Sequence, residues 1–126
     1  MGREVAAIRT PVSKEQAATF VVDGLRAKLG REPSEQEAVY TFALAWVESG
    51  RGQSIYQHNP GNVSCYDDGR GWSGDFWRPP WYPAQHDPKY DYLHQRMLDG
   101  KAPRAFRAYP DAQSGWNDYL REVVRR

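Results

Sequence analysis

The hydrophobic pattern of residues 34–63 predicts one amphipathic helix followed by a loop that contains several glycines. Ser34 and Glu37 have the spacing of a capping box, which marks the start of a helix. Apolar residues then recur at intervals of three and four, so one helix face is predicted to be buried: Ala38, Val39, Phe42, Ala43, Trp46 and Val47. Gly50 follows this run and predicts the helix end. Glu48 therefore falls in the last turn.

A second helix is predicted before this one. Ser13 and Gln16 form another capping box, an apolar stripe follows through residue 29, and Gly30 is the expected stop. The link between the two helices is short, which predicts an αα-hairpin with a shared apolar seam. Residues 1–12 lack such a pattern and are predicted to form an N-terminal arm.

Residues 64–87 have no helical period, and their prolines disfavour a regular central strand. Asp68 and Gly69 suggest a small hairpin, with short strands at 63–66 and 72–77. Long irregular segments are usually functional or disordered, and the many aromatic residues here argue against disorder. We therefore expect residues 64–87 to form a long, irregular but ordered segment.

The rest of the chain again predicts short regular elements. Asp87 and the following proline start a helix that ends at Gly100. Residues 105–109 are expected to be extended, and a last helix covers residues 112–124. The predicted fold is therefore mostly α, of the α+β class, with one domain over residues 13–126 and a small irregular β-lobe.

Composition excludes several classes of protein. The 126-residue chain has a net charge of +1, which gives no electrostatic reason to expect nucleic acid or an anionic membrane as a partner. The N-terminus lacks the apolar region of a signal peptide, so we expect synthesis in the cytoplasm. Cys65 is alone, and the three histidines lack metal-ligand spacing. No cofactor or metal is expected.

Glu48 is the first candidate for chemistry. A carboxylate at a helix C-terminus, beside Trp46 and Val47, is expected to have a raised pKa, as a general acid needs near neutral pH. Cleavage of a glycosidic bond requires such a proton donor and a group that stabilises the oxocarbenium-like centre. The alternative is a solvated glutamate at a frayed helix end.

Spacing leaves the second carboxylate open among five residues: Asp67, Asp68, Asp75, Asp87 and Asp91. Aromatic side chains of the irregular segment 64–87 are suited to stacking on sugar rings. They are Tyr66, Trp72, Trp77, Trp81 and Tyr82. A core role is the alternative for each of them. Asn59 and Asn62 either bind N-acetyl groups or simply form a turn.

Several segments together resemble a known family. They are AWVESGRGQS at 45–54, NPGNV at 59–63, WSG at 72–74, FRAY at 106–109, Ser114, and DYL at 118–120. In this order they resemble the lysozyme-like peptidoglycan hydrolases, above all the glucosaminidase branch and related phage muralytic domains. The resemblance covers about residues 34–124 and implies a lysozyme-like helical domain.

The resemblance also implies roles for individual residues. Glu48 would be the general acid, Ser49 would support it or the substrate, and Tyr109 would face the cleft. Asn59 would lie at the cleft floor. The family's second acidic residue has no clear counterpart, although Asp87 and Asp91 lie at plausible distances.

The implied function is cleavage of peptidoglycan glycan strands, by an N-acetylglucosaminidase, a lysozyme or a lytic transglycosylase that needs no cofactor. Without a signal peptide, such a protein would be encoded by a phage or prophage, and it would either be delivered by a holin or be carried in a virion tail or capsid with other virion proteins. Equally, the sequence could be a domain of a longer protein. One alternative is an inert lysozyme-like protein of the virion that binds the wall. Another is a small DNA- or protein-interaction module, which the charge disfavours for nucleic acid.

Overall fold

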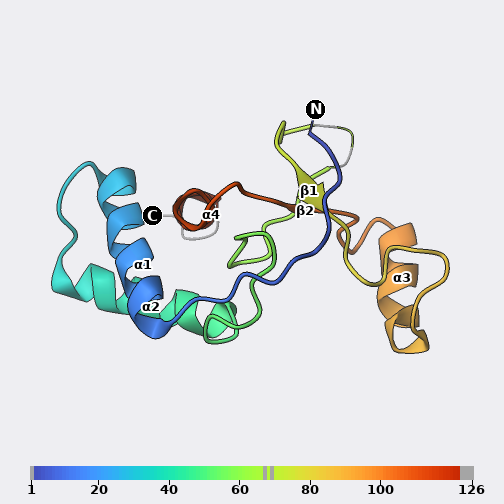
Figure 1. Ribbon diagram of the computed structural model, residues 1–126, viewed down its shortest axis with the longest axis horizontal. Helices are drawn as coiled ribbons and strands as arrows, with labels where there is room; N and C mark the ends of the chain where they lie inside the picture. Colours follow the sequence, from blue (N-terminus) through green and yellow to red (C-terminus); the bar gives the residue numbers. More distant parts are fainter. Residues whose placement is uncertain (1, 67, 69, 123–126) are drawn as a thin grey trace. The chain divides into compact units, whose positions relative to one another are not determined.

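A computed structural model describes residues 2–66, 68 and 70–122. Within this part the chain has four α-helices, a short 3₁₀ helix and one two-stranded sheet, so the mostly α, α+β prediction is confirmed. The contacts divide it into two compact units (Figure 1). Unit 1 comprises Met1–Ala7 and Ser64–Ala108, and unit 2 comprises Ile8–Val63 and Tyr109–Arg126. Each unit is described by itself.

The first two helices of unit 2 begin and end where their sequence signals predicted. Helix α1 covers Lys14–Leu29 and is preceded by Ser13, whose hydroxyl accepts a hydrogen bond from the backbone of Gln16 at 3.1 Å. Gly30 ends it in the left-handed conformation, with φ of 68°. Helix α2 covers Glu35–Glu48 and starts with a capping box of Ser34 and Glu37. Both predicted helices are confirmed.

The buried face of α2 differs from the predicted one. Thr41 and Ala45 are buried, whereas Val39 and Val47 are 62% and 74% exposed and Ala43 is also exposed. The prediction was therefore wrong for these three residues, although Phe42 and Trp46 pack against the core. Apolar residues lie on more than one side of α2, so their spacing in the sequence does not determine which side of the helix is buried. Helices α1 and α2 are in contact, and buried Ala45 of α2 belongs to the same core cluster as Ala17, Val21 and Leu25 of α1.

The core of unit 2 lies mainly between α1 and α4, which covers Ala112–Glu122. Its largest fully buried side chains are Trp116 and Tyr119 from α4, joined by Val21 and Leu25 from α1. The ring of Phe20 stacks on Trp116 with 6.2 Å between ring centroids. Residues 123 and 124, also predicted to be helical, lie outside the described residues.

Gly115 allows α4 to lie against the loop before residue 59. A Cβ atom at this position would be 1.7 Å from the backbone oxygen of His58. We therefore expect Gly115→Ala to destabilise the protein by about 1–3 kcal/mol, although alanine is the better helix former. Urea unfolding measures this, with exposed Asn117→Ala on the same helix as the control. An increase in stability for Gly115→Ala would contradict the close approach.

Residues 3–12, predicted to be an arm, form backbone hydrogen bonds in both units. In unit 1, the amide of Val5 donates to the oxygen of Phe76 at 2.8 Å. In unit 2, the amide of Thr10 donates to the oxygen of Ile55 at 2.8 Å, and Val12 is part of the core. These residues therefore contribute to both compact units.

The sheet of unit 1 consists of β1, Phe76–Trp77, paired antiparallel with β2, Phe106–Arg107. The predicted hairpin between residues 63–66 and 72–77 was wrong, because both segments pair with β2 instead. Ser64 forms a bridge to Phe106, and the ring of Phe106 stacks on Trp77 at 4.7 Å. Burial of these two rings explains the long-range pairing. Gly69 of the predicted turn lies outside the described residues.

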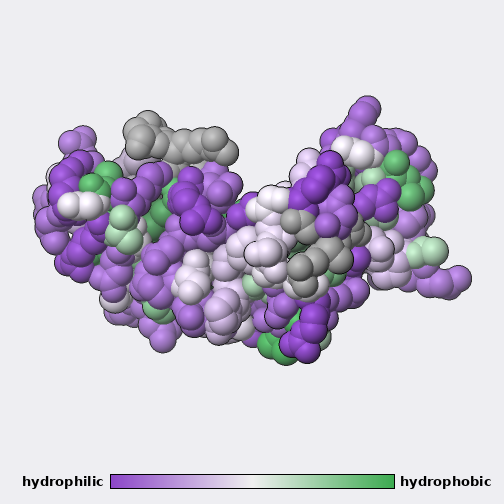
Figure 2. Space-filling model, turned by 90° about the horizontal axis from the view of Figure 1, so that it is seen from above, coloured by the Kyte–Doolittle hydropathy of each residue, from purple (hydrophilic) through white to green (hydrophobic). Residues whose placement is uncertain are grey.

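The predicted helix after Asp87 begins as the 3₁₀ helix η1, Pro88–Tyr90, and continues as α3, Asp91–Leu98. Asp87 caps η1, as its position predicted. No helix in the described part of the chain is both long and apolar enough to span a bilayer. The face drawn in Figure 2 is mostly hydrophilic, with small separate hydrophobic groups.

Candidate functional site

The candidate site of unit 2 is a hydrogen bond between Glu48 and Tyr119. Glu48 is the last residue of α2 and is exposed, whereas Tyr119 is fully buried in α4. The hydroxyl of Tyr119 donates to Oε1 of Glu48 across 71 residues of sequence. The bond connects the ESG segment with the DYL segment, which are two of the segments that carry the family resemblance.

Tyr119 is a permanent donor in this pair. Burial raises the pKa of its phenol well above the ordinary value, and the hydrogen bond and charge of Glu48 raise this pKa further. The hydroxyl therefore keeps its proton at neutral pH. Oε2 of Glu48 has no hydrogen-bond partner among the described residues, so this oxygen is available to a ligand.

The loop after α2 helps to fix the ring of Tyr119. Gly61 lies against it so closely that a Cβ atom there would be 2.2 Å from Cδ1 of the tyrosine. Trp116 packs its ring against the same tyrosine edge to face, with 6.1 Å between centroids. The NPGN turn, predicted as a possible substrate contact, thus supports the partner of Glu48.

Ser49 and Asn59 shape this loop from inside, because both are fully buried. The hydroxyl of Ser49 accepts a hydrogen bond from the amide of Gly52 at 3.1 Å. The side chain of Asn59 donates to the oxygen of Val63 at 3.0 Å and accepts from its amide at 2.8 Å. Their position leaves no surface for a substrate, and their hydrogen bonds hold the backbone. Asn62 is exposed and has a φ of 51°.

Tyr109 was expected to face a cleft, but it is buried and its hydroxyl donates to Asp118. Asp118 is only 4% exposed, and its other oxygen pairs with Arg121. The buried hydrogen bond between Tyr109 and Asp118 therefore fastens the FRAY segment, which precedes α4, to that helix. The sequence contained both residues within FRAY and DYL, but no spacing rule showed that the two segments bind each other.

The candidates for a second carboxylate have local partners in unit 1. Asp87 caps η1, and Asp91 accepts a hydrogen bond from His86 at 2.8 Å. Asp68 pairs with Arg70, and Asp75 accepts from the amide of Arg3 at 3.0 Å. Asp67 lies outside the described residues.

His86 is positioned to be most stable when protonated. Its Nδ1 lies 2.7 Å from the oxygen of Pro83 and its Nε2 lies 2.8 Å from Asp91, so both acceptors are satisfied only when both nitrogens carry protons. The Pro83 carbonyl, and after it Asp91, raises the pKa of His86 above the ordinary value. The resulting stabilisation is complete below a pH of about 6.5 and is lost as pH rises through the raised pKa.

We therefore predict that Asp91→Asn lowers the pKa of His86, because the charged acceptor is lost. A proton NMR titration of the imidazole resonances measures this, and His58 in unit 2 is the internal control. The stabilisation of unit 1 at low pH should decrease in the same variant. An unchanged His86 titration would show that Asp91 has another role.

Three aromatic candidates for sugar binding have different environments in unit 1. Trp77 is 5% exposed and packs on Phe106, so it is a core residue and not a surface for a ligand. Trp72 is half-buried and donates from Nε1 to the oxygen of Asp75 at 2.8 Å. Tyr66 is 59% exposed, with the guanidinium of Arg70 over its ring.

The described residues contain no group of three or more histidine, cysteine, aspartate or glutamate side chains that could hold a metal ion. The chain matches no protein-family model, no curated protein and no solved structure.

Proposed function

We propose that this chain cleaves the glycan strands of peptidoglycan, with Glu48 as the general acid, within a lysozyme-like arrangement of helices. The observation that carries the proposal is the hydrogen bond from buried Tyr119 to exposed Glu48. It orients one carboxyl oxygen from inside the protein and leaves the other for a substrate.

The proposed first step is proton transfer from Oε2 of Glu48 to the glycosidic oxygen. The bond between the anomeric carbon and that oxygen breaks, the leaving sugar keeps the proton, and an oxocarbenium-like centre forms. Tyr119 donates to Oε1 throughout, so it stabilises the carboxylate that remains after proton transfer. A fixed donor of this kind requires no reorganisation during the reaction.

The second step does not require a second carboxylate. The C6 hydroxyl of the substrate can attack the anomeric carbon and return its proton to Glu48, which gives a 1,6-anhydro product. Asp118, the neighbour of Tyr119, is not free to act as a second carboxylate, because its two oxygens already accept hydrogen bonds from Tyr109 and Arg121. This favours a route that needs none. We therefore favour a lytic transglycosylase, with hydrolysis by a second carboxylate as the alternative outcome.

Digestion of purified peptidoglycan by the protein tests this function. Released muropeptides are separated and their ends identified by mass spectrometry. Products with 1,6-anhydro ends are expected, whereas reducing ends would identify a hydrolase. No release from several wall types would contradict the enzyme proposal and favour an inert virion or wall-binding protein.

A further inference from the structure

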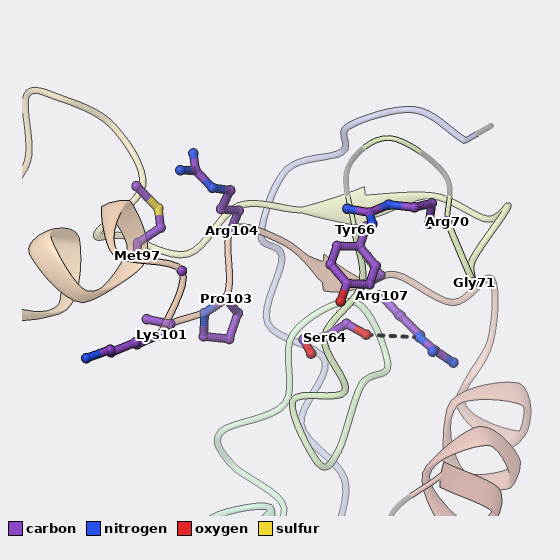
Figure 3. Close-up of a pocket in the computed structure, with 12 residues that line it drawn as sticks. Ser64, Tyr66, Arg70, Gly71, Met97, Lys101, Pro103, Arg104 and Arg107 are labelled. Atoms are coloured by element: carbon purple, nitrogen blue, oxygen red, sulfur yellow. Dashed lines mark hydrogen bonds between the residues drawn. The ribbon is translucent and has the colours of Figure 1, made fainter.

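Unit 1 contains an open hollow of about 640 Å³, and all of its lining residues belong to unit 1. Figure 3 shows its two sides. Tyr66, Arg70 and Arg107 lie on one side, and Met97, Lys101, Pro103 and Arg104 lie on the other. The volume is in the range of sites that hold small organic ligands, which is about 300–1,000 Å³.

The charge of the hollow has one sign. Four lining residues are cationic, namely Arg70, Lys101, Arg104 and Arg107, and none of the lining residues is acidic. Such a concentration of cations raises the local concentration of anions. The hollow is therefore suited to an anionic ligand.

The two arginines on the first side are held by their surroundings. Arg70 lies over the ring of Tyr66 at 4.1 Å and pairs with Asp68, which partly compensates its charge. Arg107 lies over the ring of Trp72 at 4.9 Å, and its Nε donates to the oxygen of Ser64 at 3.2 Å. Positioning of this kind reduces the entropy lost when an arginine binds a ligand.

The two cations on the second side have fixed backbones and uncompensated charges. The amide of Lys101 donates to the oxygen of Arg96 at 2.7 Å, and the oxygen of Arg104 accepts from Arg78 at 3.1 Å. Neither side chain forms an ion pair with a carboxylate in residues 2–66, 68 and 70–122. A ligand with more than one negative charge would complete this site.

We propose that the hollow binds the phosphate group of a small organic phosphate ester. A phosphate monoester provides three acceptor oxygens and a charge of about −1.5 to −2 at pH 7, whereas a carboxylate provides two oxygens and one charge. The organic part would lie against the half-buried ring of Pro103 and the exposed ring of Tyr66. The proposal does not depend on glycan cleavage.

Calorimetric titration of the full chain tests the proposal, with glycerol 3-phosphate, inorganic phosphate and lactate as probes. Glycerol 3-phosphate should bind most tightly, and its affinity should fall as salt is raised from about 50 to about 200 mM. The double variant Lys101→Gln/Arg104→Gln should bind it at least about tenfold more weakly. Amide NMR shifts should be confined to the lining segments, including Ser64 and Gly100.

The matched control is Arg3→Gln/Lys89→Gln, which removes two exposed cations of unit 1 that do not line the hollow. Thermal melting establishes that both double variants are folded. An equal loss of affinity in both would show attraction by total charge and overturn the site. Lactate binding more tightly than glycerol 3-phosphate, or inorganic phosphate binding equally well, would overturn the ligand class. Wild-type protein that binds none of the three probes would also overturn it.

Discussion

Glu48→Gln is expected to lower the rate of glycan cleavage by about 10²- to 10⁴-fold, the usual contribution of a general acid. Glutamine keeps the shape of the side chain and can still accept the hydrogen bond from Tyr119 through its amide oxygen. It cannot donate a proton to a glycosidic oxygen. The fold should therefore be retained while the reaction is lost. Initial rates of muropeptide release measure the effect.

Glu35→Gln is the matched control for this prediction. Glu35 lies in the first turn of α2, at the opposite end from Glu48, and is also exposed. It undergoes the same chemical change on the same helix. Equal rates for the wild type and Glu48→Gln would show that the proton donor is elsewhere. A similar loss in both variants would indicate a general effect of charge.

Trp116→Ala is expected to lower the free energy of unfolding by about 3–5 kcal/mol, because it removes a large buried aromatic side chain. Trp116 is 1% exposed and contacts both Phe20 in α1 and Tyr119 in α4. The cavity would also loosen the ring that donates to Glu48. Cleavage should therefore decrease even under conditions in which the variant remains folded.

Chemical denaturation followed by circular dichroism measures the loss of stability in Trp116→Ala. Tyr92→Ala is the control, because Tyr92 is an aromatic residue that is 71% exposed. Its truncation should change stability by no more than about 0.5 kcal/mol. Comparable losses in the two variants would contradict the assignment of the unit 2 core to the contact between α1 and α4.

Local signals in the sequence were sufficient to place the helix ends. The capping boxes at Ser13 and Ser34 and the left-handed Gly30 each depend on contacts within a few residues. The buried face of α2 could not be predicted in the same way. Val39 and Val47 fit the helical period as well as Ala45 does, and only the packing of the folded chain decides which residues are covered.

Contacts between residues far apart in the sequence were harder to predict, because they too depend on the packing of the folded chain. Nothing near residue 76 in the sequence indicates that β1 pairs with Phe106 and Arg107. The hydrogen bond between Tyr119 and Glu48 also joins distant residues. In the sequence, Tyr119 is simply one of the apolar positions of the last predicted helix. The family resemblance placed both segments in one motif, but their contact is a property of the folded chain.

The most direct test of Glu48 as the proton donor varies the leaving group. Aryl glycosides of the cleaved disaccharide are compared with the natural glycan, and the first turnover of the wild type and Glu48→Gln is measured for each. A dinitrophenolate leaves without protonation, so its release should be nearly equal in the two proteins while natural cleavage differs by about 10²-fold or more. An equally large deficit of Glu48→Gln on both substrates would contradict the general-acid role.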